Sequence, residues 1–189
     1  LSALLAEVAK ITVGDGQTEA VTMGPMVNAK IFGNASGQIA DARAKGARIC
    51  CGGDRLTGGL YDGGYFLPPT VIADTDHSMQ IMTEETFGPV LGIMPVDSPA
   101  QALTLANDTA YGLASGVFTR SLTRAHRMIR GIRAGIVWVN TYRAVSPIAP
   151  FGGHGLSGHG REGGMAAALD YTTVKAVWLR TSDDPIPDP

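Results

Sequence analysis

Two neighbouring carboxylates, Glu84 and Glu85, lie in the stretch TEETFGPV between apolar segments. An ionised carboxylate accepts hydrogen bonds through two oxygens, so either glutamate can hold both hydroxyls of a ribose. Phe87, two residues further on, offers a flat face to an aromatic ring. The alternative is that the glutamates begin a helix, where they favour the positive end of the helix dipole. The stretch therefore predicts either a ribose-binding loop or a helix start.

A glycine-rich segment, PFGGHGLSGHGREGG, runs from Pro150 to Gly164 and contains seven glycines. It lacks the Lys-Ser/Thr ending of a P-loop and the spacing G-x-G-x-x-G directly after a strand, so it is a weak signal for phosphate binding. The composition is typical of a flexible loop, whereas Phe151 beside two glycines indicates backbone packing close to a ligand or a partner. Glu162 is either an acid in a proton relay or the ion-pair partner of Arg161, and the residues alone favour the pair.

Histidines and cysteines are few and poorly spaced for chemistry. His154 and His159 have no third ligand at a matching spacing, so we predict no metal site. Cys50 and Cys51 lie in RICC, a short apolar run in which a thiol is usually an inert small side chain. Neighbouring cysteines are badly placed for an ordinary disulfide, which favours a reducing compartment and hence the cytoplasm.

The composition indicates an ordinary globular domain. The chain has 189 residues, of which 44% are hydrophobic and 17% charged, enough for a sizeable core. A net charge of −2 predicts no nucleic-acid partner and no attraction to an anionic membrane. No apolar run approaches the roughly 18 residues that span a bilayer, and the start LSALLAEVAK lacks the basic region of a secretory signal. Because the first residue is Leu1 rather than Met, a processed or truncated product is one interpretation.

Hydrophobic spacing predicts the helices that must position these residues. Apolar residues at three- and four-residue intervals predict helices within residues 1–11 and 32–42. The sequence SPAQ, which begins at Ser98, forms a capping box with proline at the first helical position, for a helix that runs to about Asn107. A further helix is predicted to begin at Ser121.

Apolar runs between these helices predict strands at RICC, YFLPPTVIA, VLGIMPV, YGLASGVFT and GIVWVN. RICC, VLGIMPV and GIVWVN read as buried strands, whereas the prolines of YFLPPTVIA indicate an edge strand. The alternation of helices and strands predicts an α/β fold with a mostly parallel sheet and helical crossovers. Ligands of open α/β sheets bind at the carboxyl ends of the strands, which favours one shared site for TEETFGPV and the glycine-rich segment. Near the end, YTTVKAVWLR alternates as a half-buried strand that is a candidate for pairing outside the domain.

Taken in order, TEETFGPV, ANDTAYGLASGVFT, AGIVWVN and PFGGHGLSGHGREGG closely resemble the C-terminal half of the aldehyde dehydrogenase superfamily. GYFLPPTV and YTTVKAVWL extend the resemblance from Leu1 to about Arg180. The resemblance implies a partial α/β catalytic lobe with a mostly parallel sheet, plus a C-terminal oligomerisation strand. We therefore expect a partial catalytic domain at residues 1–165, a helix end and the oligomerisation strand at 166–180, and an extended or disordered tail at 181–189.

The resemblance also implies roles for single residues. In the family the second glutamate of E-E-x-F-G-P, here Glu85, holds the ribose of the nicotinamide half of NAD or NADP, and Phe87 lies beside the same cofactor. The phenylalanine of P-F-G-G, here Phe151, lines the tunnel by which the aldehyde enters. Glu162 matches a glutamate on a proton path in some members, and Asn140 matches a residue that braces the site.

The activity implied by the resemblance is oxidation of an aldehyde to a carboxylic acid, by thiolate attack, hydride transfer to NAD(P) and hydrolysis of a thioester. The family's cysteine nucleophile, general-base glutamate, oxyanion-hole asparagine and Rossmann lobe all precede the segment that this chain matches, and Cys50 and Cys51 do not match the nucleophile. We therefore expect the 189-residue chain alone to be inactive. Gly155 stands where the family commonly has a lysine, which removes the basis for a tunnel or interface contact by that lysine.

The alternative is a non-catalytic module that associates with another chain through its C-terminal strand, by adding this strand to the partner's sheet. The resemblance implies a homo-oligomer, either a dimer or a tetramer. What precedes Leu1 separates the two hypotheses. An upstream lobe with a cysteine and a glutamate in suitable places supports the enzyme, and a true start near Leu1 supports the module.

Overall fold

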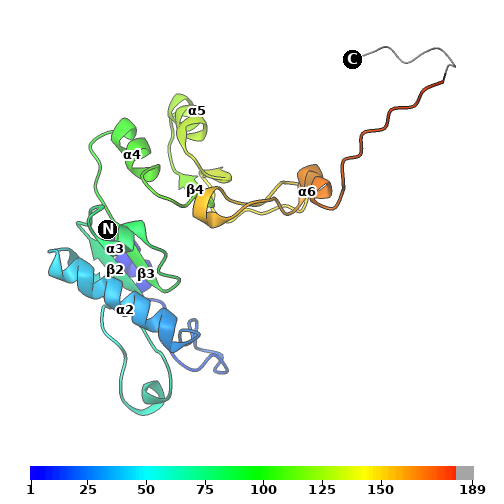
Figure 1. The fold of residues 1–189 in the computed structure, drawn as a ribbon. Coiled ribbons are helices and arrows are strands. Elements are labelled where there is room, and N and C mark those ends of the chain that lie inside the picture. Colours follow the sequence, from blue (N-terminus) through cyan, green and yellow to red (C-terminus); the bar gives the residue numbers. More distant parts are fainter. Residues whose placement is uncertain (182–189) are drawn as a thin grey trace. The chain divides into compact units, whose positions relative to one another are not determined.

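The computed structural model describes residues 1–181, which divide into two compact units. The first unit runs from Leu1 to Ala102, and the second begins at Leu103. Figure 1 shows the helices and strands in chain order, and each unit contains a small sheet of its own. Residues 182–189, the greater part of the predicted tail, lie outside the described residues.

The first unit is built on a three-stranded sheet in the order β1-β2-β3. The central strand β2 pairs antiparallel with β1 and parallel with β3. Four helical segments accompany the sheet, and α2 is the longest of them. The strands are β1 (Arg48–Cys51), β2 (Thr70–Ala73) and β3 (Val90–Ile93), and the helical segments are α1 (Ser2–Val8), α2 (Ala29–Ala44), the 3-10 helix η1 (Gly59–Gly63) and α3 (Gln80–Thr83).

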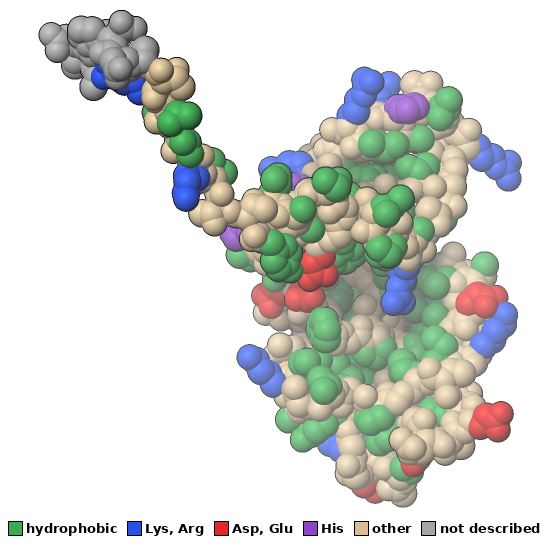
Figure 2. Space-filling model, turned by 90° about the vertical axis from the view of Figure 1, so that its right-hand side faces the viewer, with side chains coloured by type: hydrophobic (Ala, Val, Ile, Leu, Met, Phe, Trp, Pro, Cys, Tyr) green, Lys and Arg blue, Asp and Glu red, His purple; other side chains and the backbone are tan. Residues whose placement is uncertain are grey.

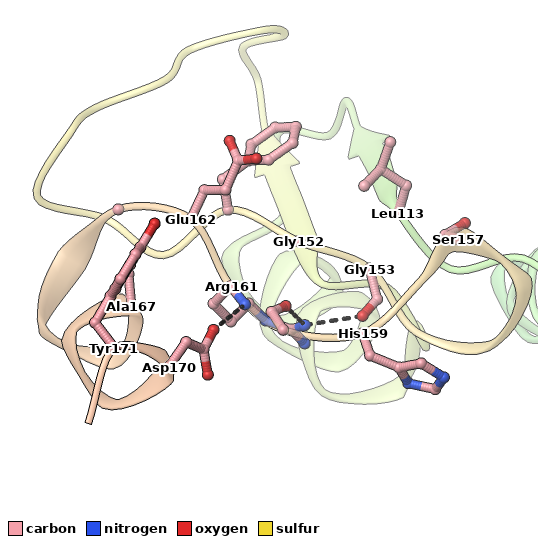
Figure 3. A pocket seen from close by; sticks show the side chains of 13 residues that line it. Leu113, Gly152, Gly153, Ser157, His159, Arg161, Glu162, Ala167, Asp170 and Tyr171 are labelled. Atoms are coloured by element: carbon pink, nitrogen blue, oxygen red, sulfur yellow. Dashed lines mark hydrogen bonds between the residues drawn. The ribbon is translucent and has the colours of Figure 1, made fainter. Parts of the chain in front are cut away.

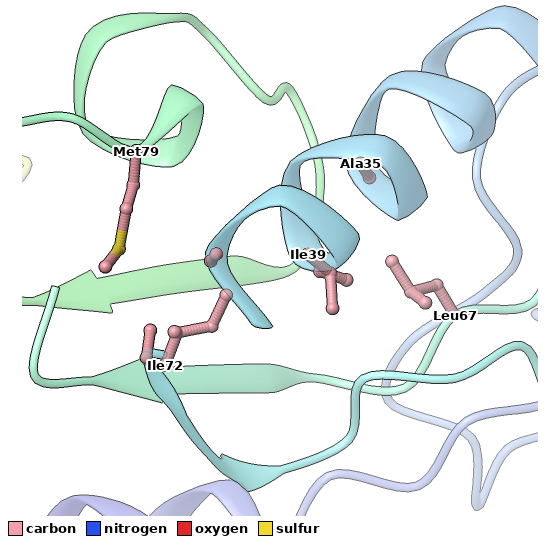
Figure 4. Close-up of a cluster of buried hydrophobic side chains, with 7 residues drawn as sticks. Ala35, Ile39, Leu67, Ile72 and Met79 are labelled. Carbon is pink, nitrogen blue, oxygen red and sulfur yellow. The ribbon is translucent and has the colours of Figure 1, made fainter. Parts of the chain in front are cut away.

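Helix α2 supplies one side of the core of the first unit. It begins where the Asn28 side chain accepts a hydrogen bond from the Ile31 N–H at 3.0 Å, which satisfies one of the free donors of the first turn. The predicted apolar stripe is confirmed, because Ala35, Ile39 and Ala42 are almost fully buried. They belong to one buried cluster with Leu67, Ile72 and Met79, and Figure 4 shows Ala35 and Ile39 of α2 beside these residues.

Burial along the strands differs from the predictions. All four residues of β2 are buried, so the edge position predicted for YFLPPTVIA is wrong. Its prolines lie before the strand, where they interrupt no ladder hydrogen bond. RICC and VLGIMPV form β1 and β3, which are the two edges of the sheet and have no fully buried residue, so their predicted burial is also wrong.

The second unit contains a parallel pair of strands, β4 (Ala114–Val117) and β5 (Ile136–Val139), joined by helix α5 (Leu122–Gly131). Helix α5 begins at the predicted Ser121, whose hydroxyl oxygen accepts the Arg124 N–H at 3.2 Å. All four residues of β5 are half-buried, so the buried strand predicted for GIVWVN is wrong in degree. The 3-10 helix η2 (Gly155–Ser157) and helix α6 (Gly164–Asp170) follow.

The capping box before α4 (Pro99–Ala106) is present in a modified form. The Ser98 hydroxyl oxygen accepts the Gln101 N–H at 3.1 Å, as predicted. The Gln101 side chain reaches back one residue further than expected and accepts the Asp97 N–H at 2.6 Å. The helix start is therefore correct, and its end falls one residue before the predicted Asn107.

The fold class is confirmed as a partial mixed α/β structure with parallel strand pairs and helices. The connection β4-α5-β5 is the helical crossover expected of parallel strands. Between the parallel strands β2 and β3 the chain forms only the four-residue helix α3. No helix in the described part of the chain is long and apolar enough to cross a membrane.

The segment predicted as a half-buried strand, residues 171–180, forms no strand with another described residue, and its side chains are exposed. Its half-burial is therefore wrong for the chain by itself. Trp178 is 96% exposed and Val174 is 97% exposed, so the apolar face of the predicted strand is uncovered. Pairing with another chain stays a prediction.

Candidate active site

The loop from Glu84 to Pro89 is held by Thr86, which lies between the candidate site residues Glu85 and Phe87. The Thr86 hydroxyl donates a hydrogen bond to the side chain of Gln38, a buried residue of α2. Gly88 lies so close to Met26 that an added Cβ would stand 2.8 Å from its methyl group. The Thr86 hydrogen bond holds the backbone just before Phe87, which adopts a left-handed φ of 50°.

On either side of Thr86 the side chains of Glu85 and Phe87 face solvent, and Phe87 is 73% exposed. Glu84 ends a helix rather than beginning one, because its N–H donates to the Gln80 oxygen at the close of α3 at 2.8 Å. The helix-start interpretation of this stretch is therefore wrong.

The loop has the properties that a bound ribose requires. The Glu85 carboxylate makes no hydrogen bond or ion pair with any residue in the described range 1–181, so both of its oxygens are available as acceptors. The exposed face of Phe87 lies two residues away on an anchored backbone. The residues present thus fit the ribose and aromatic ring of a nicotinamide nucleotide, and their contact with it stays a prediction.

The glycine-rich segment forms a compact structure in the second unit rather than a loose loop. Phe151 and Glu162 pair through their backbones, with N–H to oxygen distances of 2.6 and 2.7 Å in the two directions. This pairing brings two of the predicted site residues together at the edge of a hollow of about 510 Å³. Figure 3 shows the hollow, with Arg161 and Glu162 pointing to different sides of the segment.

The ion pair predicted between Arg161 and Glu162 is wrong. The Arg161 guanidinium donates instead to the main-chain oxygens of Gly153 and Gly160, at 2.9 and 2.6 Å. It also lies 3.3 Å from the imidazole of His154. Arginine offers five donors in a fixed fork, which suits several carbonyl oxygens of a folded loop. Glu162 is therefore an exposed carboxylate with no side-chain partner among residues 1–181, which leaves it free for the predicted proton path.

The glycines of this segment serve close packing of backbone against backbone. An added Cβ on Gly152 would stand 2.6 Å from the Gly160 oxygen, and one on Gly135 would collide with the Gly152 oxygen. Gly112 connects the segment to the sheet, because its oxygen accepts the N–H groups of both Gly135 and His154, at 3.0 and 3.1 Å. The sequence analysis missed Gly112 and Gly135, which carry only the weak signal of a glycine next to an apolar run.

Asn140 stands at the end of β5 with a left-handed φ of 53°. Its side-chain oxygen accepts the Thr119 N–H at 2.8 Å, and its amide nitrogen donates to the Thr119 oxygen at 2.9 Å. The side chain thus continues the pairing of β5 with the strand beside it, past the point where the ladder ends. This contact holds the carboxyl ends of β4 and β5 together, and a bracing role towards the site stays a prediction.

The cysteines and histidines offer no alternative site. Cys50 and Cys51 are free thiols that are half-buried on β1. The Cys51 thiol donates to the Pro69 oxygen at 3.6 Å, and the Cys50 sulfur accepts from Arg48 at 3.2 Å. Among residues 1–181, no group of three or more His, Cys, Asp and Glu side chains is placed to hold a metal ion.

The chain matches the model of the aldehyde dehydrogenase family over residues 1–177. Among curated proteins, it is 52% identical over 176 residues to a (Z)-2-((N-methylformamido)methylene)-5-hydroxybutyrolactone dehydrogenase from Acinetobacter baylyi. That alignment covers 93% of this chain and 35% of the relative, so the chain spans about a third of the relative's length.

Solved structures show the same likeness. An aldehyde dehydrogenase from Mycobacterium tuberculosis complexed with NAD+ superposes with a TM-score of 0.87 at 38% identity, over 97% of this chain and 38% of that one. A betaine aldehyde dehydrogenase from Staphylococcus aureus in complex with NAD+ gives a TM-score of 0.84 at 36% identity, over 90% and 34%. The fold is thus that of a mixed α/β dehydrogenase chain. With a family match over nearly its whole length, the chain belongs to the aldehyde dehydrogenase family.

Proposed function

We propose that this chain is part of an NAD(P)-dependent enzyme that oxidises an aldehyde to a carboxylic acid. The family match over residues 1–177 carries the proposal, and the NAD+ complexes of the two similar structures support the choice of cofactor. Because the chain spans only about a third of its relatives, the activity belongs to the whole protein that contains it. We propose that its role is to hold one end of the cofactor and to form part of the aldehyde tunnel.

Glu85 is the residue that we propose for the cofactor's ribose. Its two free oxygens accept hydrogen bonds from both ribose hydroxyls, and a charged acceptor makes such bonds about twice as strong as a neutral one. Phe87 contributes a flat apolar face beside the same group. When bound, NAD(P)+ supplies the hydride acceptor. The anchored loop orients the cofactor because Thr86 cannot move without losing its hydrogen bond to Gln38.

In the second unit, we propose that Phe151 lines the aldehyde tunnel and that Glu162 passes a proton to or from solvent. The backbone pairing of these two residues keeps the aromatic wall and the carboxylate at a constant separation. Glu162 is exposed, which allows exchange of its proton with water. Asn140 supports this arrangement indirectly. Its two hydrogen bonds to Thr119 fix the end of β5, and the chain continues from there to Phe151.

A test of the proposal compares Glu85→Gln with Glu84→Gln in the protein that contains this chain. Loss of the charged acceptor at Glu85 should raise the KM for the cofactor or lower kcat, with a combined loss in kcat/KM of about 10- to 100-fold. Glu84→Gln removes the same charge one residue away and should change kcat/KM by less than about threefold. Equal effects of the two substitutions, or no aldehyde-dependent NADH or NADPH in the parent protein, would contradict the proposal.

The second candidate function is association through the C-terminal segment. The observation that favours it is the set of exposed apolar side chains near the end of the described chain, where Val174, Val177 and Trp178 are 97%, 75% and 96% exposed. We propose that this segment adds a strand to the sheet of another copy, which gives a dimer or a tetramer. In this function the chain associates without contributing to catalysis.

A further inference from the structure

The net charge of −2 conceals an uneven distribution of charge. Residues 1–102 carry six Lys and Arg against eleven Asp and Glu, a net charge of −5. Residues 103–181 carry nine against three, a net charge of +6. The charge of the whole chain is therefore too coarse a guide to what the second unit can bind.

The positive charge is concentrated around α5. No acidic residue occurs between Asp108 and Glu162. Figure 2 shows basic and histidine side chains at the top of the view, at the height that α5 occupies in Figure 1. The stretch contains seven arginines, at positions 120, 124, 127, 130, 133, 143 and 161.

Two of these arginines serve the fold, whereas those on α5 do not. Arg133 donates to the main-chain oxygen of Asn107 at 2.6 Å, and Arg161 donates to the glycine-rich segment. Within residues 1–181 the ion pairs of arginine involve Arg43 and Arg48 of the first unit. No hydrogen bond or ion pair to a described residue is made by the guanidinium groups of Arg124, Arg127 and Arg130.

A hollow of about 640 Å³ lies beside two of the unused arginines. On one side Leu103 of α4 packs against Gly131, which has no room for a Cβ there. On the other side α5 contributes residues three and four positions apart, which share one face of a helix. The polar lining consists of Thr123, His126, Arg127 and Arg130.

The walls of this hollow are fixed by Asn107, just after α4. Its amide nitrogen donates to the Gly131 oxygen at 2.8 Å, and its side-chain oxygen accepts the Arg133 N–H at 2.8 Å. One side chain therefore ties the end of α4 to the end of α5. A preformed hollow spares a ligand the cost of ordering its site.

We propose that this hollow binds a small molecule that carries a phosphate group. The guanidinium fork matches phosphate oxygens in geometry, and the two charges of Arg127 and Arg130 balance a doubly ionised phosphate. The Thr123 hydroxyl adds a donor, and Leu103 offers an apolar surface to the carbon part of the ligand. The C-terminal end of the α5 dipole opposes an anion by about half a charge, which two full positive charges exceed. The site belongs to neither the cofactor loop nor the glycine-rich segment.

Peptide-resolved modification of arginine tests the site in the protein that contains this chain. Phenylglyoxal labels exposed guanidinium groups, and inorganic pyrophosphate is the probe ligand. Pyrophosphate should slow the labelling of Arg127 and Arg130 by about tenfold and leave that of Arg120 and Arg124 within about twofold. Equal protection of all four arginines would mean a diffuse field only and would overturn the proposal, as would the absence of any protection. Citrate, a carboxylate anion of similar charge, should protect less than pyrophosphate.

A pair of matched double variants provides an independent measurement by titration calorimetry. Arg127→Gln/Arg130→Gln should weaken pyrophosphate binding by about tenfold or more. Arg120→Gln/Arg124→Gln removes the same charge from the same segment outside the hollow, and should weaken binding by less than about threefold. Equal losses of pyrophosphate affinity in the two double variants would overturn the proposed phosphate site. If the first variant does not fold, the labelling of the parent protein decides alone.

Discussion

The absence of a side chain at Gly135 is as important to this chain as the side chains of its candidate site residues. Gly135 lacks a side chain at a point where the main-chain oxygen of Gly152 lies directly against it. Its φ is not in the left-handed region, so space and not backbone conformation excludes a larger residue. The consequence is that the glycine-rich segment can approach the start of β5 closely enough for Phe151 and Glu162 to pair.

Gly135→Ala should therefore destabilise the protein that contains this chain by about 1–3 kcal/mol, because the new methyl group must displace backbone. It should also lower kcat/KM, since the segment that carries Phe151 and Glu162 has to move. Gly37→Ala is the matched control. Gly37 lies inside α2 with nothing within 4 Å of an added Cβ, and the change should be neutral or stabilise by up to about 1 kcal/mol. Thermal unfolding measures both, and equal shifts would show that the close approach of Gly135 has no effect on stability.

Helix starts were predicted well because their signals lie within a few residues of sequence. Strand burial was predicted poorly because it depends on which strands lie beside each other in the sheet. Ser98 and Ser121 were predicted to begin helices, and the hydroxyl of each accepts the N–H of the residue three positions further on, a spacing that a sequence displays directly. Strand burial follows from the order β1-β2-β3, which no single run of residues contains, and all three burial predictions for this sheet were wrong. The predicted ion pair of Arg161 with Glu162 was wrong for the same reason. The acceptors of Arg161 are main-chain oxygens that only the folded loop brings close to it.

The link between α2 and α3 should make the stability of the first unit depend on pH. A hydrogen bond from Lys45 and one from the Gln80 N–H hold the pKa of Asp41 below its usual range. A lowered pKa in the folded state means that the ionised carboxylate stabilises the fold above the unfolded pKa, and that this is lost as the pH falls through the folded value.

Asp41→Asn should accordingly cost stability at pH 7, with a difference from the parent that shrinks below about pH 4. Asp97→Asn gives the baseline, because the Asp97 carboxylate has no partner among residues 1–181. Urea unfolding at several pH values measures the difference between the two variants. A constant difference from pH 7 to pH 3 would show that the ionisation of Asp41 does not contribute to folding.

At the scale of the whole molecule, the chain is two units with separate sheets and about a third of the length of its relatives. The residues proposed for the cofactor lie in the first unit, and those proposed for the tunnel lie in the second. The residues that the sequence analysis assigned to one shared site thus come from both units, and their meeting in one site stays a prediction. The two cysteines, Cys50 and Cys51, lie on β1 of the first unit, and we predict that neither is the nucleophile expected from the family resemblance.

The 189-residue chain by itself should form no NADH or NADPH when it is given aldehyde and cofactor, because an enzyme without its nucleophile loses many orders of magnitude in rate.

The mass of the chain in solution should nevertheless be that of a dimer or a tetramer of 19.7-kDa chains, which associate through the exposed C-terminal segment. Trp178→Glu should convert it to a monomer, because a charge opposes burial of that strand. Light scattering and cofactor absorbance provide the two readouts. Cofactor reduction by the chain alone would refute the first expectation, and a monomeric parent chain the second.

The loop from Glu84 to Pro89 has two solvent-facing side chains, Glu85 and Phe87, on either side of the half-buried anchor Thr86, and this has a consequence for how such a loop can evolve. Substitutions at Glu85 or Phe87 alter what the loop offers to a ligand without removing the Thr86 hydrogen bond. A one-residue insertion or deletion shifts Thr86 relative to Gln38 and removes that hydrogen bond. The loop is therefore free to vary in chemistry and constrained in length, so relatives with new ligand preferences should differ here by replacement and not by gaps.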